Sequence, residues 1–160
     1  MARSSASATM NRMARVQQFA FVVSLVFLIV GILGFIPGIT THYGSMKFAG
    51  HDSMAKLFGL FQVSVLHNIV HLLFGVVGLL LARTVAGARN FLIGGGIIYL
   101  ILWIYGLVVG HESQANFVPL NTADNWLHLV LGVGMIALGV LGTRGLTARD
   151  KGGIASGMPR

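Results

Sequence analysis

The residues best suited to chemistry lie in two short, matching segments. The sequence contains His67-Asn68-Ile69-Val70-His71-Leu72-Leu73-Phe74-Gly75 and, 57 residues later, Asp124-Asn125-Trp126-Leu127-His128-Leu129-Val130-Leu131-Gly132. Residues three or four apart share one side of a helix, so in each segment the Asn, the His and the residue before the Asn form one stripe. The pattern therefore predicts a polar cluster inside a helical protein. Its members are His67, Asn68, His71, Asp124, Asn125 and His128.

A structural network of hydrogen bonds is the first hypothesis for this cluster. Asn and His side chains can hold neighbouring membrane helices together, and each such bond contributes about 1 kcal/mol or less. Asp124 also has a local role open to it. A carboxylate in the first turn of a helix complements the helix dipole and can accept a hydrogen bond from the backbone of Asn121.

A bound cofactor is the second hypothesis. His residues spaced four apart are a good transition-metal pair, so His67 and His71 with His128 and Asp124 are candidate metal ligands. His71 and His128 are candidate axial ligands of a b-type haem held between two helices. A proton or solute path is the third hypothesis, because His titrates near neutral pH.

The elements that must position these side chains are membrane spans. Hydrophobic residues make up 55% of the 160-residue chain and charged residues only 9%, which excludes an ordinary soluble enzyme domain. Four stretches of 31, 26, 22 and 19 residues have no Lys, Arg, Asp or Glu. About 20 apolar residues suffice for a helix to cross a bilayer. We therefore expect an all-α membrane protein with four spans, at about residues 16–36, 58–82, 90–110 and 124–143.

The ends and connections follow from turn and capping signals. Pro37-Gly38 ends the first span, and Asp52-Ser53 offers an N-cap for a second helix that reaches Ala82. Residues 84–88 are expected to form a short turn. Residues 1–15 and 144–160 are expected to be basic tails, and the first apolar stretch is too long for a signal peptide and is expected to be retained.

Charge predicts the orientation of the spans. Nine of the 11 Lys and Arg residues fall on one side of the four-span arrangement. The positive-inside rule then places both termini in the cytoplasm. The net charge of +7 is therefore attributed to topology and to lipid headgroups rather than to nucleic acid.

Glycine and the matching segments indicate how the helices pack. The chain has 22 glycines, and small residues let membrane helices approach closely. Those expected at packing positions are Gly75, Gly78, Gly132 and Gly139. Because both matching segments would enter from the external side, they also predict a duplicated helical hairpin related by an axis along the membrane normal.

The segment Pro119-Leu-Asn-Thr-Ala-Asp-Asn-Trp-Leu-His-Leu-Val-Leu-Gly132, together with His67 to Gly75, resembles a bacterial membrane family catalogued as domain of unknown function 4383. The resemblance extends from about Gln17 to Thr143. It implies four spans and a prokaryotic cytoplasmic membrane, and it supplies no activity, cofactor or site.

No catalytic template fits the sequence, since paired carboxylates are absent and Ser53 and Ser64 lack a nucleophile-elbow context. We expect a small non-enzymatic accessory, scaffold or interaction subunit without a cofactor, embedded in the lipid bilayer, in a larger complex or self-associated. The alternatives are a haem- or metal-binding electron-transfer subunit and a small proton or solute transporter.

Overall fold

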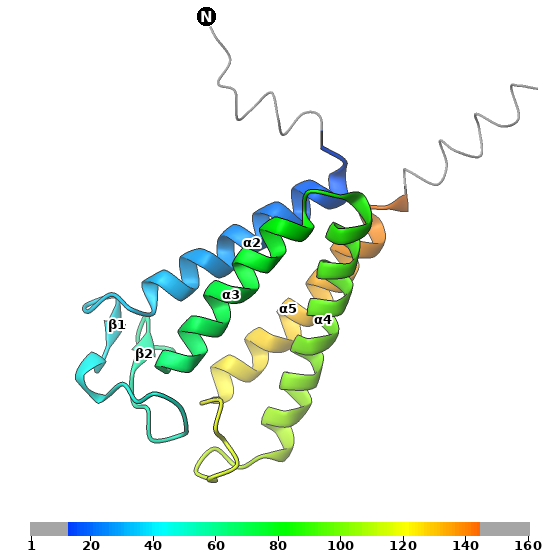
Figure 1. Cartoon of the computed structure of the whole chain (residues 1–160). Helices are drawn as coiled ribbons and strands as arrows, with labels where there is room; N and C mark the ends of the chain where they lie inside the picture. Colours follow the sequence, from blue (N-terminus) through cyan, green and yellow to red (C-terminus); the bar gives the residue numbers. More distant parts are fainter. Residues whose placement is uncertain (1–12, 145–160) are drawn as a thin grey trace, which may run out of the picture.

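The computed structural model describes residues 13–144, and the predicted tails lie almost wholly outside this range. The chain is mostly helical, with a small sheet in the first long connection (Figure 1). Its elements, in order, are α2 (Arg15–Leu33), β1 (Thr40–Thr41), the 3-10 helix η1 (Tyr43–Ser45), β2 (Lys56–Leu57), β3 (Phe61–Gln62), α3 (Val65–Leu81), α4 (Val85–Val108) and α5 (Thr122–Leu141).

The four helices pack in two pairs. α2 lies mainly against α3 and α4 mainly against α5, while α2 also contacts α4. α3 and α4 are joined by a short turn and separate towards the sheet end of the molecule (Figure 1). The described chain begins and ends at the turn end. The core between the pairs contains Phe27, Phe91, Leu92, Tyr99 and Met135.

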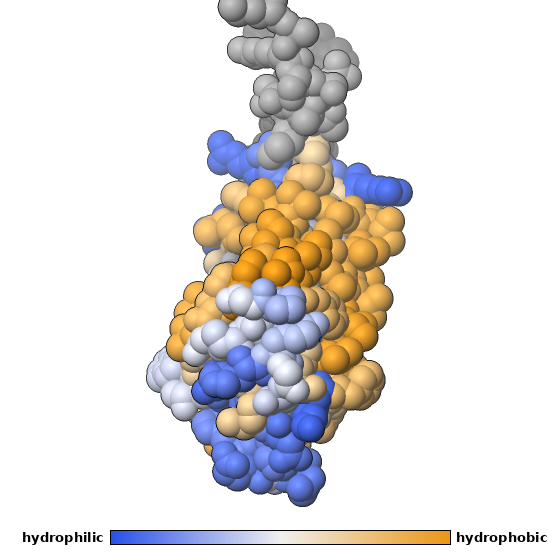
Figure 2. Space-filling model, turned by 90° about the vertical axis from the view of Figure 1, so that its left-hand side faces the viewer, coloured by the Kyte–Doolittle hydropathy of each residue, from blue (hydrophilic) through white to orange (hydrophobic). Residues whose placement is uncertain are grey.

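The surface of the helices is apolar. Residues such as Ile29, Leu73, Ile101 and Val130 are all more than half exposed. Figure 2 shows hydrophobic residues over the helical part and hydrophilic residues gathered at its two ends. A soluble protein would lose free energy by exposing so continuous an apolar surface, so this surface suits a lipid environment.

Three helices are long and apolar enough to cross a membrane, namely α2, α4 and α5. The fourth apolar helix, α3, has 17 residues. At about 1.5 Å per residue α3 is about 26 Å long, slightly less than a typical hydrocarbon core of about 30 Å.

The predicted start of the second helix is wrong. Instead of beginning near Ser53 or residue 58, α3 begins at Val65, where the Ser64 hydroxyl caps the helix by accepting a hydrogen bond from the His67 backbone N–H at 3.1 Å. Residues before it form the antiparallel β2–β3 hairpin, whose turn residues Phe58 and Gly59 have φ of 53° and 72°. These positive φ values are incompatible with a continuing right-handed helix.

Ser53 has a different role from the predicted N-cap. Its hydroxyl donates to the Val63 carbonyl at 2.6 Å and accepts from the Lys47 backbone N–H at 3.2 Å. β1 completes the sheet, in the order β1-β2-β3, by pairing Thr40 with Leu57. The first connection is thus a folded cap over one end of the helices rather than an open loop.

The other helix boundaries differ less. α2 ends at Leu33, before Pro37, and α5 begins at Thr122 and ends at Leu141. The predicted turn at residues 84–88 is wrong, because Thr84 accepts a hydrogen bond from Gly87 N–H at 3.0 Å and so caps α4, which begins at Val85.

Candidate functional site

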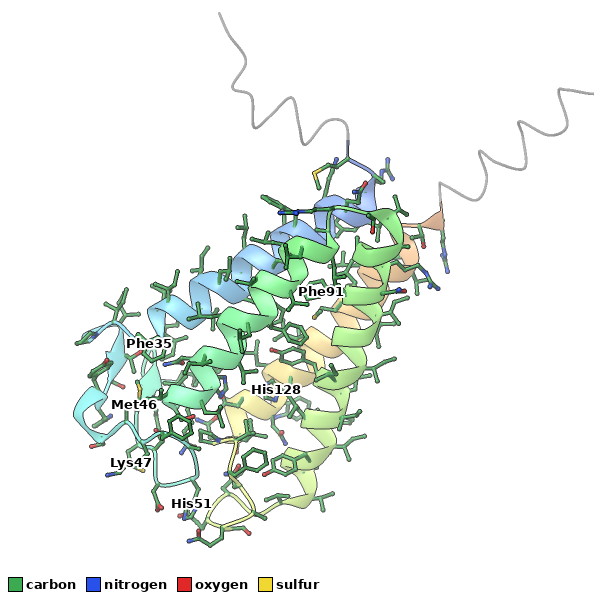
Figure 3. All side chains as sticks on the ribbon, in the orientation of Figure 1. Phe35, Met46, Lys47, His51, Phe91 and His128 are labelled. Atoms are coloured by element: carbon green, nitrogen blue, oxygen red, sulfur yellow. The ribbon has the colours of Figure 1, made fainter. Side chains whose placement is uncertain are left out.

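The predicted polar residues lie on the inner sides of α3 and α5. Five of them are buried, and His67 is half-buried in the first turn of α3. Figure 3 shows His128 directed between the helices, whereas Lys47 and His51 lie in the connections at the sheet end. The six side chains do not form one hydrogen-bonded network. They divide into three imidazoles, two amides and one carboxylate with different surroundings.

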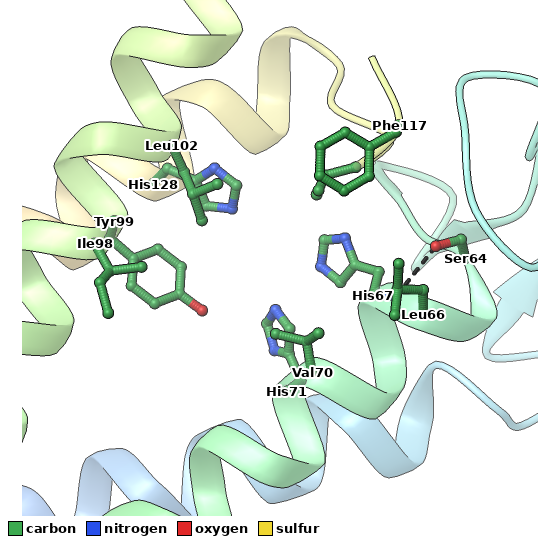
Figure 4. A pocket seen from close by; sticks show the side chains of 11 residues that line it. Ser64, Leu66, His67, Val70, His71, Ile98, Tyr99, Leu102, Phe117 and His128 are labelled. Atoms are coloured by element: carbon green, nitrogen blue, oxygen red, sulfur yellow. Dashed lines mark hydrogen bonds between the residues drawn. The ribbon is translucent and has the colours of Figure 1, made fainter. Parts of the chain in front are cut away.

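The three imidazoles surround a pocket between α3 and α4, which we call the lateral pocket (Figure 4). Its volume is about 320 Å³. His67 and His71 stack with ring centroids 4.7 Å apart and an interplanar angle of 20°. The hydroxyl of Tyr99 points towards the same space. Its lining residues are Ser64, Leu66, His67, Val70, His71, Ile98, Tyr99, Leu102, Phe117, Val118 and His128.

The imidazoles have unused hydrogen-bonding capacity. Nδ1 of His67, His71 and His128 is buried, and within residues 13–144 it has no hydrogen-bond partner. A buried polar atom left without a partner costs about 1–3 kcal/mol. Three such atoms lie beside one pocket, which makes this a costly arrangement of polar groups.

Aromatic rings support two of the imidazoles from behind. His71 meets Phe27 at 5.4 Å and 69°, and His128 meets Tyr99 at 5.2 Å and 65°. Phe27 and Tyr99 in turn stack on each other at 5.4 Å and 23°. The rings of α2 and α4 thus fix the orientations of His71 on α3 and His128 on α5.

Each amide lies over a glycine at the C-terminal end of the preceding helix, Gly34 as the C-cap of α2 and Gly106 in the last turn of α4. A Cβ added to Gly34 would meet Asn68 Oδ1 at 2.2 Å, and one added to Gly106 would meet Asn125 Oδ1 at 1.9 Å. The two Asn side chains therefore occupy the space that the glycines leave, and they act in helix packing.

The Asp124 carboxylate, in the first turn of α5, accepts hydrogen bonds from backbone N–H groups. Its Oδ2 accepts hydrogen bonds from Asn121 N–H and from Gln62 N–H, both at 3.0 Å, while Asn121 Oδ1 accepts from Asp124 N–H. This is the reciprocal capping arrangement that the sequence suggests for Asp124 and Asn121. The bond to Gln62 adds a second role, because it ties the β2–β3 hairpin to α5.

The glycines expected in packing lie at helix contacts. A Cβ on Gly75 would meet Leu28 at 2.6 Å, and a Cβ on Gly132 would meet Leu100 at 2.7 Å. Added Cβ atoms would also lie 2.1 Å from Ser24 at Gly78 and 2.8 Å from Ile93 at Gly139.

Comparison with known proteins identifies the family. The family model described as "Domain of unknown function (DUF4383)" matches residues 17–141, which run from α2 to the end of α5. The chain belongs to the DUF4383 family. No curated protein and no solved structure matches it.

The candidate metal ligands are not arranged as a metal-binding set in this DUF4383 chain. Among residues 13–144, no three His, Cys, Asp or Glu side chains are arranged to hold a metal ion. Asp124, a candidate ligand, directs its carboxylate to two backbone N–H groups instead. His71 and His128, the candidate haem ligands, both line the lateral pocket.

The sequence did not predict several residues that line the lateral pocket, above all Tyr99 and Phe117. Tyr99 was detectable in principle, because it carries a hydroxyl in the middle of an otherwise apolar run. Its approach to His128 depends on the packing of α4 against α5, which no local pattern encodes. Phe117 comes from the connection between α4 and α5, and no sequence signal marks it.

Proposed function

We propose that the protein is a four-span protein of the bacterial cytoplasmic membrane, with both termini in the cytoplasm. The apolar surface and lengths of α2, α4 and α5 support this. α3 has 17 residues, the lower limit for a spanning helix, and would cross with its ends in the interfaces. Arg15, Arg83 and Arg89 lie at the end where the described chain starts and finishes, as does Arg144. The positive-inside rule assigns that end to the cytoplasm.

A duplicated hairpin is part of this proposal. α2–α3 and α4–α5 repeat the same contacts, since Phe27–His71 corresponds to Tyr99–His128 and Gly34–Asn68 corresponds to Gly106–Asn125. The stacked rings of Phe27 and Tyr99 are equivalent positions in the two hairpins, 72 residues apart. Contact between equivalent positions favours a pseudo-two-fold axis that passes between α2 and α4.

The proposed activity is binding. The protein would be a non-enzymatic accessory subunit, alone or in a larger membrane complex, that holds a small molecule taken from the bilayer in the lateral pocket. The observation that carries this proposal is the convergence of the three imidazoles of His67, His71 and His128 on one pocket with an otherwise mostly apolar lining. A ligand with a polar group could pair with these rings while its apolar part contacts the rest of the lining.

The pocket lining favours binding over group transfer. Its serine, Ser64, already caps α3 through its hydroxyl. Its other polar groups are the imidazoles and the Tyr99 phenol, and the remaining lining is apolar. This composition, mostly apolar with a few convergent polar groups, is typical of small-molecule sites.

Stability measurements with native lipid test the binding proposal. Purified protein in mild detergent should gain thermal stability when a total bacterial lipid extract is added, because a ligand at 100 times its Kd stabilises by about 2.7 kcal/mol. Val70→Trp, at the pocket mouth, should abolish the gain. Val77→Trp adds the same bulk at another exposed position of α3, seven residues on, and should keep it. An equal response of the two variants, or no gain for the wild type, would contradict the proposal.

The accessory role needs a separate experiment. A gentle-detergent pull-down of tagged full-length protein should recover a defined set of membrane proteins, or a discrete oligomer of the chain. Recovery of a lone monomer that turns over a substrate would contradict the accessory role while leaving the pocket intact.

A further inference from the structure

Two pockets meet at the same imidazoles, and they differ in how they are closed. His67, His71 and His128 line both the lateral pocket and a smaller pocket of about 190 Å³. The smaller one is covered by apolar side chains of the sheet region, including Leu57, Phe58, Phe61 and Val63. We call it the hairpin-covered pocket.

Hydrogen bonds at the start of α5 hold the β2–β3 hairpin over the hairpin-covered pocket. Gln62 N–H of β3 donates to Asp124 Oδ2, and Asn121 Nδ2 donates to the Leu60 carbonyl at 2.8 Å. In the repeated segments Asp124 corresponds to His67. Asp124, which holds the hairpin over the hairpin-covered pocket, therefore corresponds to His67, whose imidazole lines the lateral pocket.

The lateral pocket opens between two helices. Val70 on α3 is 47% exposed and Ile98 on α4 is 48% exposed, so the pocket mouth lies on the apolar helical surface. Val70 lies in the first half of α3 and Ile98 just past the middle of α4. The two helices separate towards these parts of the chain (Figure 1). In a bilayer this mouth faces lipid, and a lipid-soluble molecule can enter sideways.

The chemistry of the lining restricts the head group of such a molecule. The described lining residues include no Lys or Arg, so a phosphate head group would find no fixed cation there. A phenol O–H and imidazole N–H groups are donors that suit carbonyl oxygens. The rings of Tyr99, Phe117 and the stacked pair His67–His71 offer aromatic surfaces for a planar group. A volume of about 320 Å³ accommodates one substituted ring rather than a diacyl lipid.

We propose that the lateral pocket binds the head group of a lipid-soluble quinone. Its ring would lie among His67, His71, His128 and Tyr99, with the carbonyl oxygens accepting hydrogen bonds from the imidazoles and from the Tyr99 hydroxyl. Its apolar tail would leave between Val70 and Ile98 into the bilayer. This inference rests on the proposed binding function and specifies its ligand class.

Binding of decylubiquinone tests this inference. Full-length protein is placed in phosphatidylcholine nanodiscs, and its unfolding temperature is measured against increasing decylubiquinone or decylbenzene, which has the same tail and no carbonyl groups. We expect a saturable rise in unfolding temperature with decylubiquinone alone. Tyr99→Phe and His67→Leu should each raise its Kd about tenfold, the effect of losing one hydrogen bond in a buried site.

Mouth variants locate the binding. Val70→Trp and Ile98→Trp should abolish the saturable rise in unfolding temperature, and Val77→Trp should leave the Kd unchanged. Equal rises with the two probes, or a Kd that Val70→Trp does not change, would overturn the quinone assignment. If the total lipid extract stabilises the protein through the pocket and decylubiquinone does not bind, the quinone assignment fails and the binding function stands. If neither ligand has an effect, both fail.

Discussion

Asn125 on α5 lies against Gly106 on α4 so closely that a Cβ on the glycine would come 1.9 Å from Asn125 Oδ1. Asn68 has the same relation to Gly34, at 2.2 Å. In each pair a planar amide covers a bare stretch of backbone. One contact joins the end of α2 to α3 and the other joins α4 to α5, both close to the imidazoles. Loss of either contact should therefore disturb the helix packing and the lateral pocket.

Gly106→Ala should therefore destabilise the protein by about 1–3 kcal/mol, the usual cost of forcing an extra methyl group into a packed interface. Gly94→Ala is the matched control, because a Cβ at Gly94 on the same helix meets nothing within 4 Å. Unfolding in SDS–detergent mixtures measures both. Equal stability of the two variants would show that Asn125 does not occupy this space.

The Asp124 carboxylate should hold the β2–β3 hairpin on α5. Asp124→Ala leaves the backbone N–H groups of Gln62 and Asn121 without an acceptor, at about 1–3 kcal/mol for each group that stays buried. Limited proteolysis of the connection between α2 and α3 should then become faster. Glu112→Ala removes an exposed acid from the connection between α4 and α5, and this variant should be cleaved at the wild-type rate. An unchanged rate for Asp124→Ala would mean that the sheet stays attached without this carboxylate.

The number of helices was predictable because it depends on local properties. Gaps between charges marked the apolar helices, and the repeated Asn-x-x-His spacing marked the inner sides of α3 and α5. The hairpin was missed because Leu57 to Val63 is apolar and lies in an uninterrupted uncharged stretch. Only Gly59 hints at a turn, and nothing local shows that Phe58 adopts a positive φ.

The pocket was only half predictable for a related reason. His67, His71 and His128 stood out as polar residues in apolar runs. Tyr99 and Phe117 reach the same space through the packing of α4 and its following connection, which are long-range contacts. Two Asn residues were placed in the same cluster, yet they face glycines, and that distinction depends on which helix each residue meets.

Labelling of introduced cysteines should test the orientation, and the chain is well suited to it because it has no Cys of its own. Gln114→Cys, in the exposed connection between α4 and α5, should react with a membrane-impermeant maleimide in intact spheroplasts. Ala86→Cys, exposed at the start of α4, should react only after the membrane is opened. The opposite labelling pattern would reverse the orientation and contradict the assignment from charge.

Spectroscopy should separate a quinone-binding subunit from a haem or metal protein. Because the lateral pocket suits a carbonyl-bearing ring, we expect purified protein without a Soret band. Because no three-ligand metal set occurs among residues 13–144, we also expect no stoichiometric metal. A Soret band that disappears in His71→Ala and His128→Ala would instead establish the haem alternative. Stoichiometric metal lost in His67→Ala would establish a metal site.

A pH-dependent flux would support the remaining alternative, a small proton or solute transporter. Proteoliposomes containing the wild-type protein should show no proton flux above that of empty liposomes if His71 and His128 serve binding alone. Flux that is abolished by His71→Ala would contradict this and indicate a path that passes from one pocket to the other through the shared imidazoles.

The stacked pair Phe27 and Tyr99 should couple the two hairpins. Phe27→Ala and Tyr99→Ala should each cost about 3–5 kcal/mol, because both rings are buried and each supports a His ring. Since the rings touch, the double variant should lose less than the sum, by about 0.5–1.5 kcal/mol.

Phe117 supplies the control for this cycle. It packs against Tyr105, with centroids 6.4 Å apart, and Phe117→Ala should be additive with Phe27→Ala. Tyr99→Phe should keep nearly all the stability, because it retains the ring and removes only the hydroxyl proposed to bind ligand. Strict additivity of Phe27→Ala and Tyr99→Ala would mean that the two hairpins do not depend on each other at this contact. The pseudo-two-fold axis between α2 and α4 would then lose its main support.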